Sequence, residues 1–287
     1  MTNPETSGVE LPEMDLLRKF DVPAPRYTSY PTADRFHAGF GVEDYKRALA
    51  GRKDEKEPAD LSLYVHVPFC NDVCYYCGCN KIVTRDHSKS AEYIETIGKE
   101  AELVKEVITG SMELKQLHFG GGTPTYLTND EFAHMMEVIT KVFPLAEKGE
   151  FSIEVDPRTC PPEKVAMLRK VGLNRMSCGV QDFNADVQKA INRIQPFEMT
   201  KATIDAARAE GFESVNMDLI YGLPKQTRAT FAETIDKVLE LSPDRIALYH
   251  YAHLPNHFKA QRRILPADLP DIGAADNGHT FPARSKR

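Results

Sequence analysis

The chain has 287 residues, of which 41% are hydrophobic and 27% are charged, and its formal net charge is −6. This composition excludes a disordered chain, and no apolar run approaches the roughly 20 residues that cross a bilayer. The acidic balance argues against a nucleic-acid binder that works by neutralising phosphates. Residues 1–10 are polar and lack a signal pattern, so we expect a cytoplasmic protein without a membrane span.

The first part of the chain, residues 1–58, is interpreted as an N-terminal arm and strap. Residues 26–32 contain Arg26, Tyr27 and Tyr30, a combination that suits an extended segment packed over a surface. A strap that also closes a substrate cleft is the alternative. Residues 41–58 predict a short helix followed by a charged linker.

From residue 61 onward, β-rich runs alternate with amphipathic segments. Strands are predicted at 62–67, 115–119, 151–155, 175–180, 214–220 and 245–251. Helices are predicted at 91–109, 130–143, 162–171 and around 202–209, the last two stopped by Gly172 and Gly211, and Thr227 is predicted to cap a further helix. Repeated βα units predict a parallel sheet, either doubly wound or a partial barrel, with its site at the carboxyl ends of the strands.

Four cysteines, Cys70, Cys74, Cys77 and Cys79, fall within ten residues directly after the first predicted strand. Three thiolates at C-x3-C-x2-C spacing can hold three irons of a [4Fe–4S] cluster and leave the fourth iron open. A zinc site built from all four cysteines is the alternative, but zinc sites usually pair two C-x2-C knuckles across a long gap. The remaining cysteines, Cys160 and Cys178, are expected to be buried core thiols.

Polar and glycine-rich residues follow the other predicted strands. The run Gly120–Gly122 is expected to let the backbone approach a cofactor, the alternative being a tight turn only. Glu154 or Asp156 is placed to bind ribose hydroxyls, although either is also an ordinary charge at a strand end. Further polar groups suited to a nucleoside or a carboxylate are Gln181, Arg193 and Asp218.

The cysteine spacing resembles that of the radical S-adenosylmethionine (SAM) superfamily. This resemblance implies an α/β fold, a partial (βα)6 barrel of parallel strands. It also implies that the amino and carboxylate groups of SAM chelate the open iron. The reduced cluster then cleaves SAM to methionine and a 5′-deoxyadenosyl radical, which removes a hydrogen atom from the substrate.

Longer motifs resemble the oxygen-independent coproporphyrinogen III oxidase family from about residue 20 to about residue 271. They lie at 26–32, 64–70, 77–85, 120–125, 152–158, 179–183, 218–226 and 251–255. Cys79 favours this family, because related haem-chaperone-like members usually lack the Gly-Cys pair after the three-cysteine motif. The resemblance implies haem biosynthesis, in which two propionates of coproporphyrinogen III lose carbon dioxide and become the vinyl groups of protoporphyrinogen IX.

The same resemblance implies site residues and two bound SAM molecules. Cys70, Cys74 and Cys77 would ligate the cluster, and Cys79 would act near the substrate without being a ligand. The first SAM would contact Tyr64, Gly121 and Glu154. The second SAM, or the space next to it, would be lined by Tyr76, Gly122, Thr123, Gln181, Arg193, Asp218 and Ala252. Candidate partners for the substrate carboxylates are Arg26, Lys81 and Arg85.

The catalytic domain is expected at 59–271, and residues 272–287 diverge from the family as a tail without helical or strand period, expected to be disordered. Family members continue into a C-terminal helical domain, which we expect to be absent here through truncation or a shifted reading frame. The cluster and the first SAM would then bind while turnover is impaired.

Two further alternatives stay open, a non-catalytic haem- or porphyrin-binding relative and another radical SAM enzyme such as a methyltransferase. We expect a monomer. The sequence indicates neither the electron donor nor the electron acceptor.

Overall fold

The computed structural model describes residues 35–51 and 60–270, together with the isolated positions 13, 16, 19 and 32. Residues 45–270 form one compact unit, and residues 1–44 with 271–287 form another. The predicted strap at 26–32 lies outside the described residues except for Thr32, and so does the predicted tail at 272–287.

A six-stranded parallel sheet forms the centre of the unit at 45–270. Its strands are β1 (Leu61–Val67), β4 (Leu114–Gly121), β5 (Leu145–Val155), β6 (Arg175–Gln181), β7 (Ser214–Tyr221) and β8 (Arg245–His250). They lie side by side in the order β1-β4-β5-β6-β7-β8, which is also their order in the chain. All six predicted strands are therefore confirmed, and β5 begins six residues earlier than predicted.

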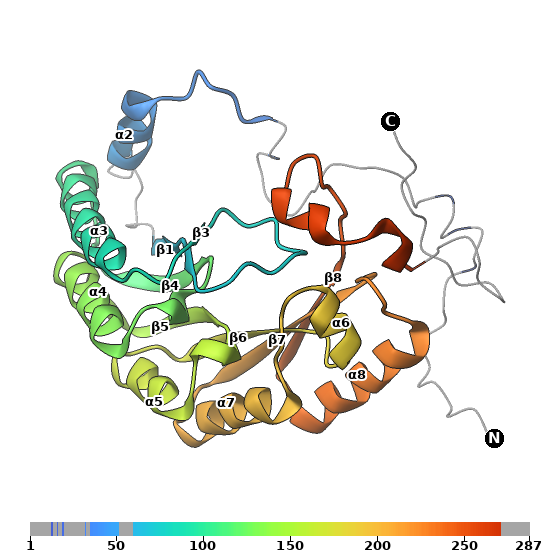
Figure 1. Cartoon of the computed structure of the whole chain (residues 1–287). Helices are drawn as coiled ribbons and strands as arrows, with labels where there is room; N and C mark the ends of the chain where they lie inside the picture. Colours follow the sequence, from blue (N-terminus) through green and yellow to red (C-terminus); the bar gives the residue numbers. More distant parts are fainter. Residues whose placement is uncertain are drawn as a thin grey trace. The chain divides into compact units, whose positions relative to one another are not determined.

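Helices connect successive strands of this sheet. They are α3 (Ser88–Val107), α4 (Asn129–Val142), α5 (Pro162–Lys170), α7 (Phe197–Ala209) and α8 (Arg228–Leu241). Figure 1 shows these five helices along one face of the curved sheet. A doubly wound sheet has helices on both faces and reverses its strand order, so this arrangement is a partial (βα)6 barrel.

Periodicity predicted the long elements well. The short helix expected within 41–58 is α2 (Val42–Ala50). Helix α6 (Ala185–Ala190) was not predicted, nor was the two-stranded parallel sheet of β2 (Phe69–Cys70) and β3 (Ile82–Val83). Both are too short to show a hydrophobic period. Single 3-10 turns complete the described chain: η3 (Pro124–Tyr126), η4 (Pro157–Thr159), η5 (Lys259–Arg263) and η6 (Pro266–Asp268).

The main core lies between the sheet and the helices on its outer face. Phe119 and Ile153 on the strands are fully buried, as are Ile139 on α4 and Val238 on α8. Strands β6 and β7 bury alternate residues on this side, whereas β8 has no fully buried residue. In the described part of the chain, every helix is too short or too polar to cross a lipid bilayer.

The cap predicted at the start of α8 is present. The Thr227 hydroxyl accepts a hydrogen bond from the Thr230 backbone N–H, and the Thr230 hydroxyl accepts one from the Thr227 backbone N–H, which completes a capping box. Replacing Thr227 with alanine is expected to remove about 1 kcal/mol of stability, or roughly 2 °C in melting temperature. Thermal unfolding followed by circular dichroism measures the shift. Thr96→Ala, in the exposed middle of α3, should cost nothing, and equal shifts in both variants would contradict the cap's contribution.

Candidate cofactor site

A cavity of about 400 Å³ lies at the carboxyl ends of the strands, and residues from all six strands or the loops after them line it. The predicted site residues on its wall are Cys70, Cys74, Tyr76, Cys77, Cys79, Gly121, Gly122, Thr123, Glu154, Gln181, Arg193 and Asp218. Tyr64 and Ala252 are not among the lining residues. The structure thus brings nearly the whole predicted set together from positions up to 148 residues apart in the chain.

The first residues of the cysteine loop are held by hydrogen bonds to their backbone carbonyls. The Cys70 carbonyl in β2 accepts a hydrogen bond of 3.0 Å from the Thr84 N–H, and the side chain of Asn192 donates one of 2.8 Å to the Val73 carbonyl. All six cysteines of the chain are free. Cys160 and Cys178 are fully buried in the core, which confirms their expected position.

The thiols of this loop differ in their environment. Hydrogen bonding from Cys79 lowers the pKa of the Cys77 thiol to about 5, whereas the same contact raises the pKa of Cys79. Burial raises the pKa of Cys70 to about 12, and the neighbouring thiols of Cys77 and Cys74 add to this rise. Cys79 thus donates a hydrogen bond to the sulfur of Cys77, a candidate cluster ligand, and this distinguishes it from the other three cysteines of the loop.

The glycine run after β4 packs against the chain's own backbone. Gly121 has φ of +122°, a region that favours glycine, and the Gly122 N–H donates a hydrogen bond of 2.8 Å to the Val67 carbonyl. A Cβ added to Gly122 would lie 2.6 Å from the Pro68 carbonyl oxygen. The glycines therefore have a packing reason that the sequence did not reveal, and their predicted approach to a cofactor stays a prediction.

An aromatic and acidic group on β1, β4 and β5 lies beside the cavity, and Glu154 is the member of the group that lines it. The Tyr64 ring stacks on His118 with 5.7 Å between ring centroids, and the Tyr64 hydroxyl lies 3.0 Å from Nδ1 of His66. His118 contacts Ser152 Oγ at 2.6 Å and Glu154 Oε1 at 3.4 Å. Glu154 lines the cavity, and Tyr64, which does not, contacts the same histidine.

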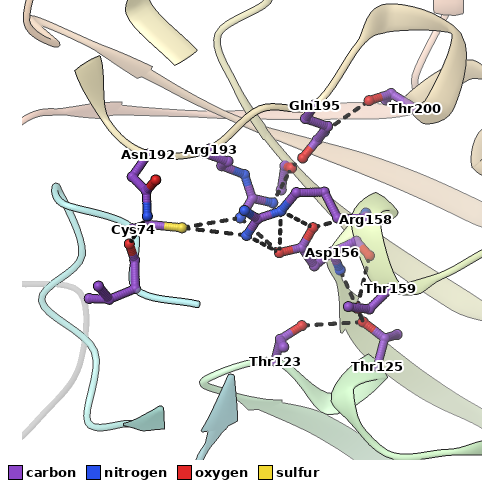
Figure 2. Close-up of polar contacts among 12 residues, drawn as sticks. Cys74, Thr123, Thr125, Asp156, Arg158, Thr159, Asn192, Arg193, Gln195 and Thr200 are labelled. Atoms are coloured by element: carbon purple, nitrogen blue, oxygen red, sulfur yellow. Dashed lines mark hydrogen bonds and ion pairs between the residues drawn. The ribbon is translucent and has the colours of Figure 1, made fainter. Parts of the chain in front are cut away.

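Asp156 lies at the centre of a buried ion-pair group (Figure 2). Its carboxylate accepts hydrogen bonds from Arg158 Nη2 at 2.6 Å and from Arg193 Nη1 at 2.9 Å. Burial raises the pKa of Asp156, but Arg193 and Arg158 outweigh it and lower that pKa to about 2. Since Asp156 is committed to two guanidinium groups and the Glu154 side chain is 47% exposed, Glu154 is the better candidate for ribose hydroxyls.

The next two strands present an amide and a carboxylate. Gln181 has φ of 68° where the register with β7 shifts, and its side-chain amide has no hydrogen-bond partner among the described residues. Gly179 leaves room for that amide, which lies 3.0 Å from where a Cβ would be. Asp218 accepts hydrogen bonds from Ser177 at 3.0 Å and Asn216 at 2.8 Å, and burial raises its pKa.

Ala252 is tied to the cysteine loop by a residue that the sequence did not single out. The buried Gln261 amide donates hydrogen bonds to the Tyr76 carbonyl at 2.9 Å and to the Ala252 carbonyl at 3.2 Å. The contact joins residues 185 positions apart, and no local pattern marks it. Arg158 was also missed, although it follows a strand end in a charged Asp-Pro-Arg run.

The three residues predicted to pair with substrate carboxylates differ in their positions relative to the cavity. Lys81 lies on the cavity wall, where its ammonium also donates to the Cys77 and Cys79 carbonyls. Arg85 pairs with Asp72 at 3.1 Å on the surface and does not line the cavity. Arg26 lies outside the described residues.

The donor set fits a cluster better than a single ion. Three thiols lie on the wall of one cavity, with two guanidinium groups behind Cys74 to offset thiolate charge. Among the described residues, no three His, Cys, Asp or Glu side chains converge closely enough to hold one metal ion. Each thiolate of a four-iron cluster binds a separate iron, so such convergence is not required.

The chain belongs to the radical SAM superfamily, whose family model matches residues 64–238, more than half of its length. A [4Fe–4S] cluster and SAM are therefore the cofactors of this site, which favours the iron–sulfur interpretation of the cysteines over the zinc one. The more specific similarity is to oxygen-independent coproporphyrinogen III oxidases. The protein of that name from Pseudomonas aeruginosa is 47% identical over 263 residues, covering 91% of this chain and 57% of that protein.

The same similarity appears in a second curated relative and in a solved structure. The Escherichia coli protein of the same name is 47% identical over 259 residues, covering 90% of this chain and 55% of that protein. The solved structure of coproporphyrinogen III oxidase from Escherichia coli, a radical SAM enzyme, matches with a TM-score of 0.82 at 46% identity. That match covers 89% of this chain and 56% of the solved one. The chain spans about half the length of the relatives it matches.

Proposed function

We propose that the chain carries out the oxygen-independent oxidative decarboxylation of coproporphyrinogen III to protoporphyrinogen IX in haem biosynthesis. The observation that carries this proposal is 47% identity over 91% of the chain to a relative named for that activity. Each propionate would lose one hydrogen atom, one electron and carbon dioxide, and a vinyl group would remain. When bound, the reduced cluster and SAM supply the radical that removes the hydrogen atom.

The residues of the cysteine loop would hold the cluster. We assign Cys70, Cys74 and Cys77 as its three ligands, supported by their position on one cavity wall and by the hydrogen bonds that fix their loop. Glu154 would bind the ribose of the first SAM, since it lines the cavity. Tyr64 would support that wall by its contact with His118.

The far side of the cavity would hold the second SAM molecule. The residues assigned to it are Tyr76, Gly122, Thr123, Gln181, Arg193, Asp218 and Ala252. The unpartnered amide of Gln181 supports this assignment, because it leaves a donor and an acceptor for a ligand. Arg193 has less capacity left, since its guanidinium already contacts Asp156 and the Gly179 carbonyl.

A substrate with four carboxylates needs at least one cationic side chain in the cavity, and the cysteine ligands need a compartment that keeps their thiols reduced. Lys81 would pair with one substrate carboxylate, because it is a lysine on the cavity wall close to Cys79. We infer a cytoplasmic protein, since a reducing compartment keeps the tightly spaced cysteines available as ligands.

Anaerobic reconstitution with iron and sulfide tests the proposed function. The reconstituted protein receives SAM, a reductant and coproporphyrinogen III, and both 5′-deoxyadenosine and vinyl-containing porphyrin are measured by chromatography. Formation of both supports the proposal. Production of 5′-deoxyadenosine with no loss of propionate overturns the porphyrinogen reaction. Haem binding with neither product favours the non-catalytic relative.

Cys79→Ala is expected to keep the full iron content of the reconstituted protein and to lose at least about tenfold in vinyl product. The reason is that Cys79 lies on the cavity wall beside a ligand without being one of the three. Iron analysis and product chromatography on the same sample separate the two effects. Cys160→Ala, a buried thiol outside the cavity, is the control and should keep both. Loss of the cluster in Cys79→Ala would contradict the assignment.

A further inference from the structure

Two arginines and one aspartate lie buried directly behind Cys74. The side chains of Asp156 and Arg193 are 9% and 7% exposed, and that of Arg158 is 21% exposed. Arg158 Nη2 lies 3.5 Å from Cys74 Sγ, and Arg193 Nη1 lies 3.7 Å from the same sulfur. Figure 2 shows both guanidinium groups between the carboxylate and the thiol.

The charges of this group do not balance among themselves. One carboxylate faces two guanidinium groups, which leaves one buried positive charge. A buried charge without a partner is costly, and the sulfur of Cys74 is the neighbouring atom through which a bound anionic group would offset it. The group therefore favours negative charge on anything bonded to that sulfur.

Arg158 is the member of the group whose contacts are the most restricted. Its backbone N–H, Nε and Nη2 all donate to Asp156, and its one other hydrogen bond within the described part of the chain is to Cys74 Sγ. Turn η4 fixes its position directly after β5, with Pro157 at the start of the turn. Arg193 also binds the Gly179 carbonyl, so its replacement would disturb more than the sulfur.

We propose that Arg158 is a positioning residue that raises the reduction potential of the iron–sulfur cluster through its hydrogen bond to Cys74 Sγ, with Asp156 holding the guanidinium in place. The proposal rests on the proposed role of Cys74 as a cluster ligand. Reduction adds one electron, which takes the cluster from the 2+ to the 1+ state and increases its negative charge. Hydrogen bonds to ligand sulfurs and nearby positive charge stabilise the reduced state.

The test is a potentiometric titration of wild type and Arg158→Gln after anaerobic reconstitution. Dithionite supplies the electron and is oxidised to sulfite, and electron paramagnetic resonance measures the reduced cluster. Iron and sulfide content are determined first. We expect full iron in the variant and about tenfold less reduced cluster at a fixed potential, equivalent to about 59 mV for one electron. Arg158→Lys, which keeps the charge but not the planar fork, should shift in the same direction by less.

Arg175→Gln is the matched control, because Arg175 pairs with Glu150 at 3.1 Å at the start of β6 and should leave the potential unchanged. An unchanged potential in Arg158→Gln overturns the proposal. If Arg158→Gln does not assemble a cluster, an unchanged potential in Arg158→Lys overturns it instead. Wild-type protein that assembles no cluster would contradict the assignment of the cysteines, which is a separate outcome.

Discussion

Cys77→Ala is expected to give a folded protein that assembles at least about tenfold less iron and sulfide than wild type. Three thiolates are the smallest set from which this loop can hold a cluster with one open iron, so two should not suffice. Cys77 is partly exposed, and its removal leaves no large cavity in the core. Iron and sulfide analysis and the absorption of the reconstituted protein measure the loss, and circular dichroism establishes that the fold persists.

The control for this prediction is again Cys160→Ala, which should keep its full iron because its thiol lies in the core. The double variant Cys77→Ala with Cys79→Ala sharpens the result, since Cys79 lies beside the vacated position. If the single variant keeps its iron and the double variant loses it, Cys79 is able to act as a ligand. The division of the loop into three ligands and one further thiol would then be wrong.

Gly122→Ala is expected to destabilise the protein by about 1–3 kcal/mol or more, the usual range for overpacking. An added Cβ would lie 2.6 Å from the Pro68 carbonyl oxygen and 2.8 Å from that of Phe69, and both obstacles are backbone atoms. Relief requires the segment between β1 and β2 to move, and that segment leads into Cys70. Lower thermal stability should therefore come with lower iron content after reconstitution.

Two other glycines serve as controls that distinguish the effect of a steric clash from the effect of a left-handed backbone conformation. A Cβ at Gly51 or at Gly211 meets no atom of the described residues within 4 Å, but Gly211 has φ of +77°. Gly51→Ala should be nearly neutral, and Gly211→Ala should cost about 1 kcal/mol without changing iron content. The idea that Gly122 is required by close packing fails if Gly122→Ala behaves like Gly51→Ala in both thermal unfolding and iron analysis.

The sequence predicted the strands and helices of the sheet because each is marked by a pattern that extends over many neighbouring residues. Helices such as α3 and α4 repeat apolar residues over several turns, and each strand is a compact β-rich run. The two-residue strands β2 and β3 carry no such period, yet they fix Cys70. The extra residues of β5 include a charged and glycine-containing run, residues 147–150, which is not typical of a strand.

The sequence predicted which residues line the site, but it did not predict which of these residues contact one another. Motifs placed most of the lining residues at the ends of strands, and parallel strands bring those ends together. The sequence did not show whether Glu154 or Asp156 is available to a ligand, because the ion pair of Asp156 with Arg193 joins residues 37 positions apart. The same is true of Gln261, whose contact with Tyr76 exists only in the folded chain.

Gln181 combines a cavity-facing amide with a left-handed backbone conformation that a glutamine adopts at a cost of about 1 kcal/mol. Glycine or asparagine would adopt this conformation more readily, but neither would reach as far into the cavity. Selection for stability and selection for cofactor binding therefore oppose each other at this position. A gene copy released from its catalytic role would be expected to lose this glutamine early in its divergence and to encode a more stable protein as a result.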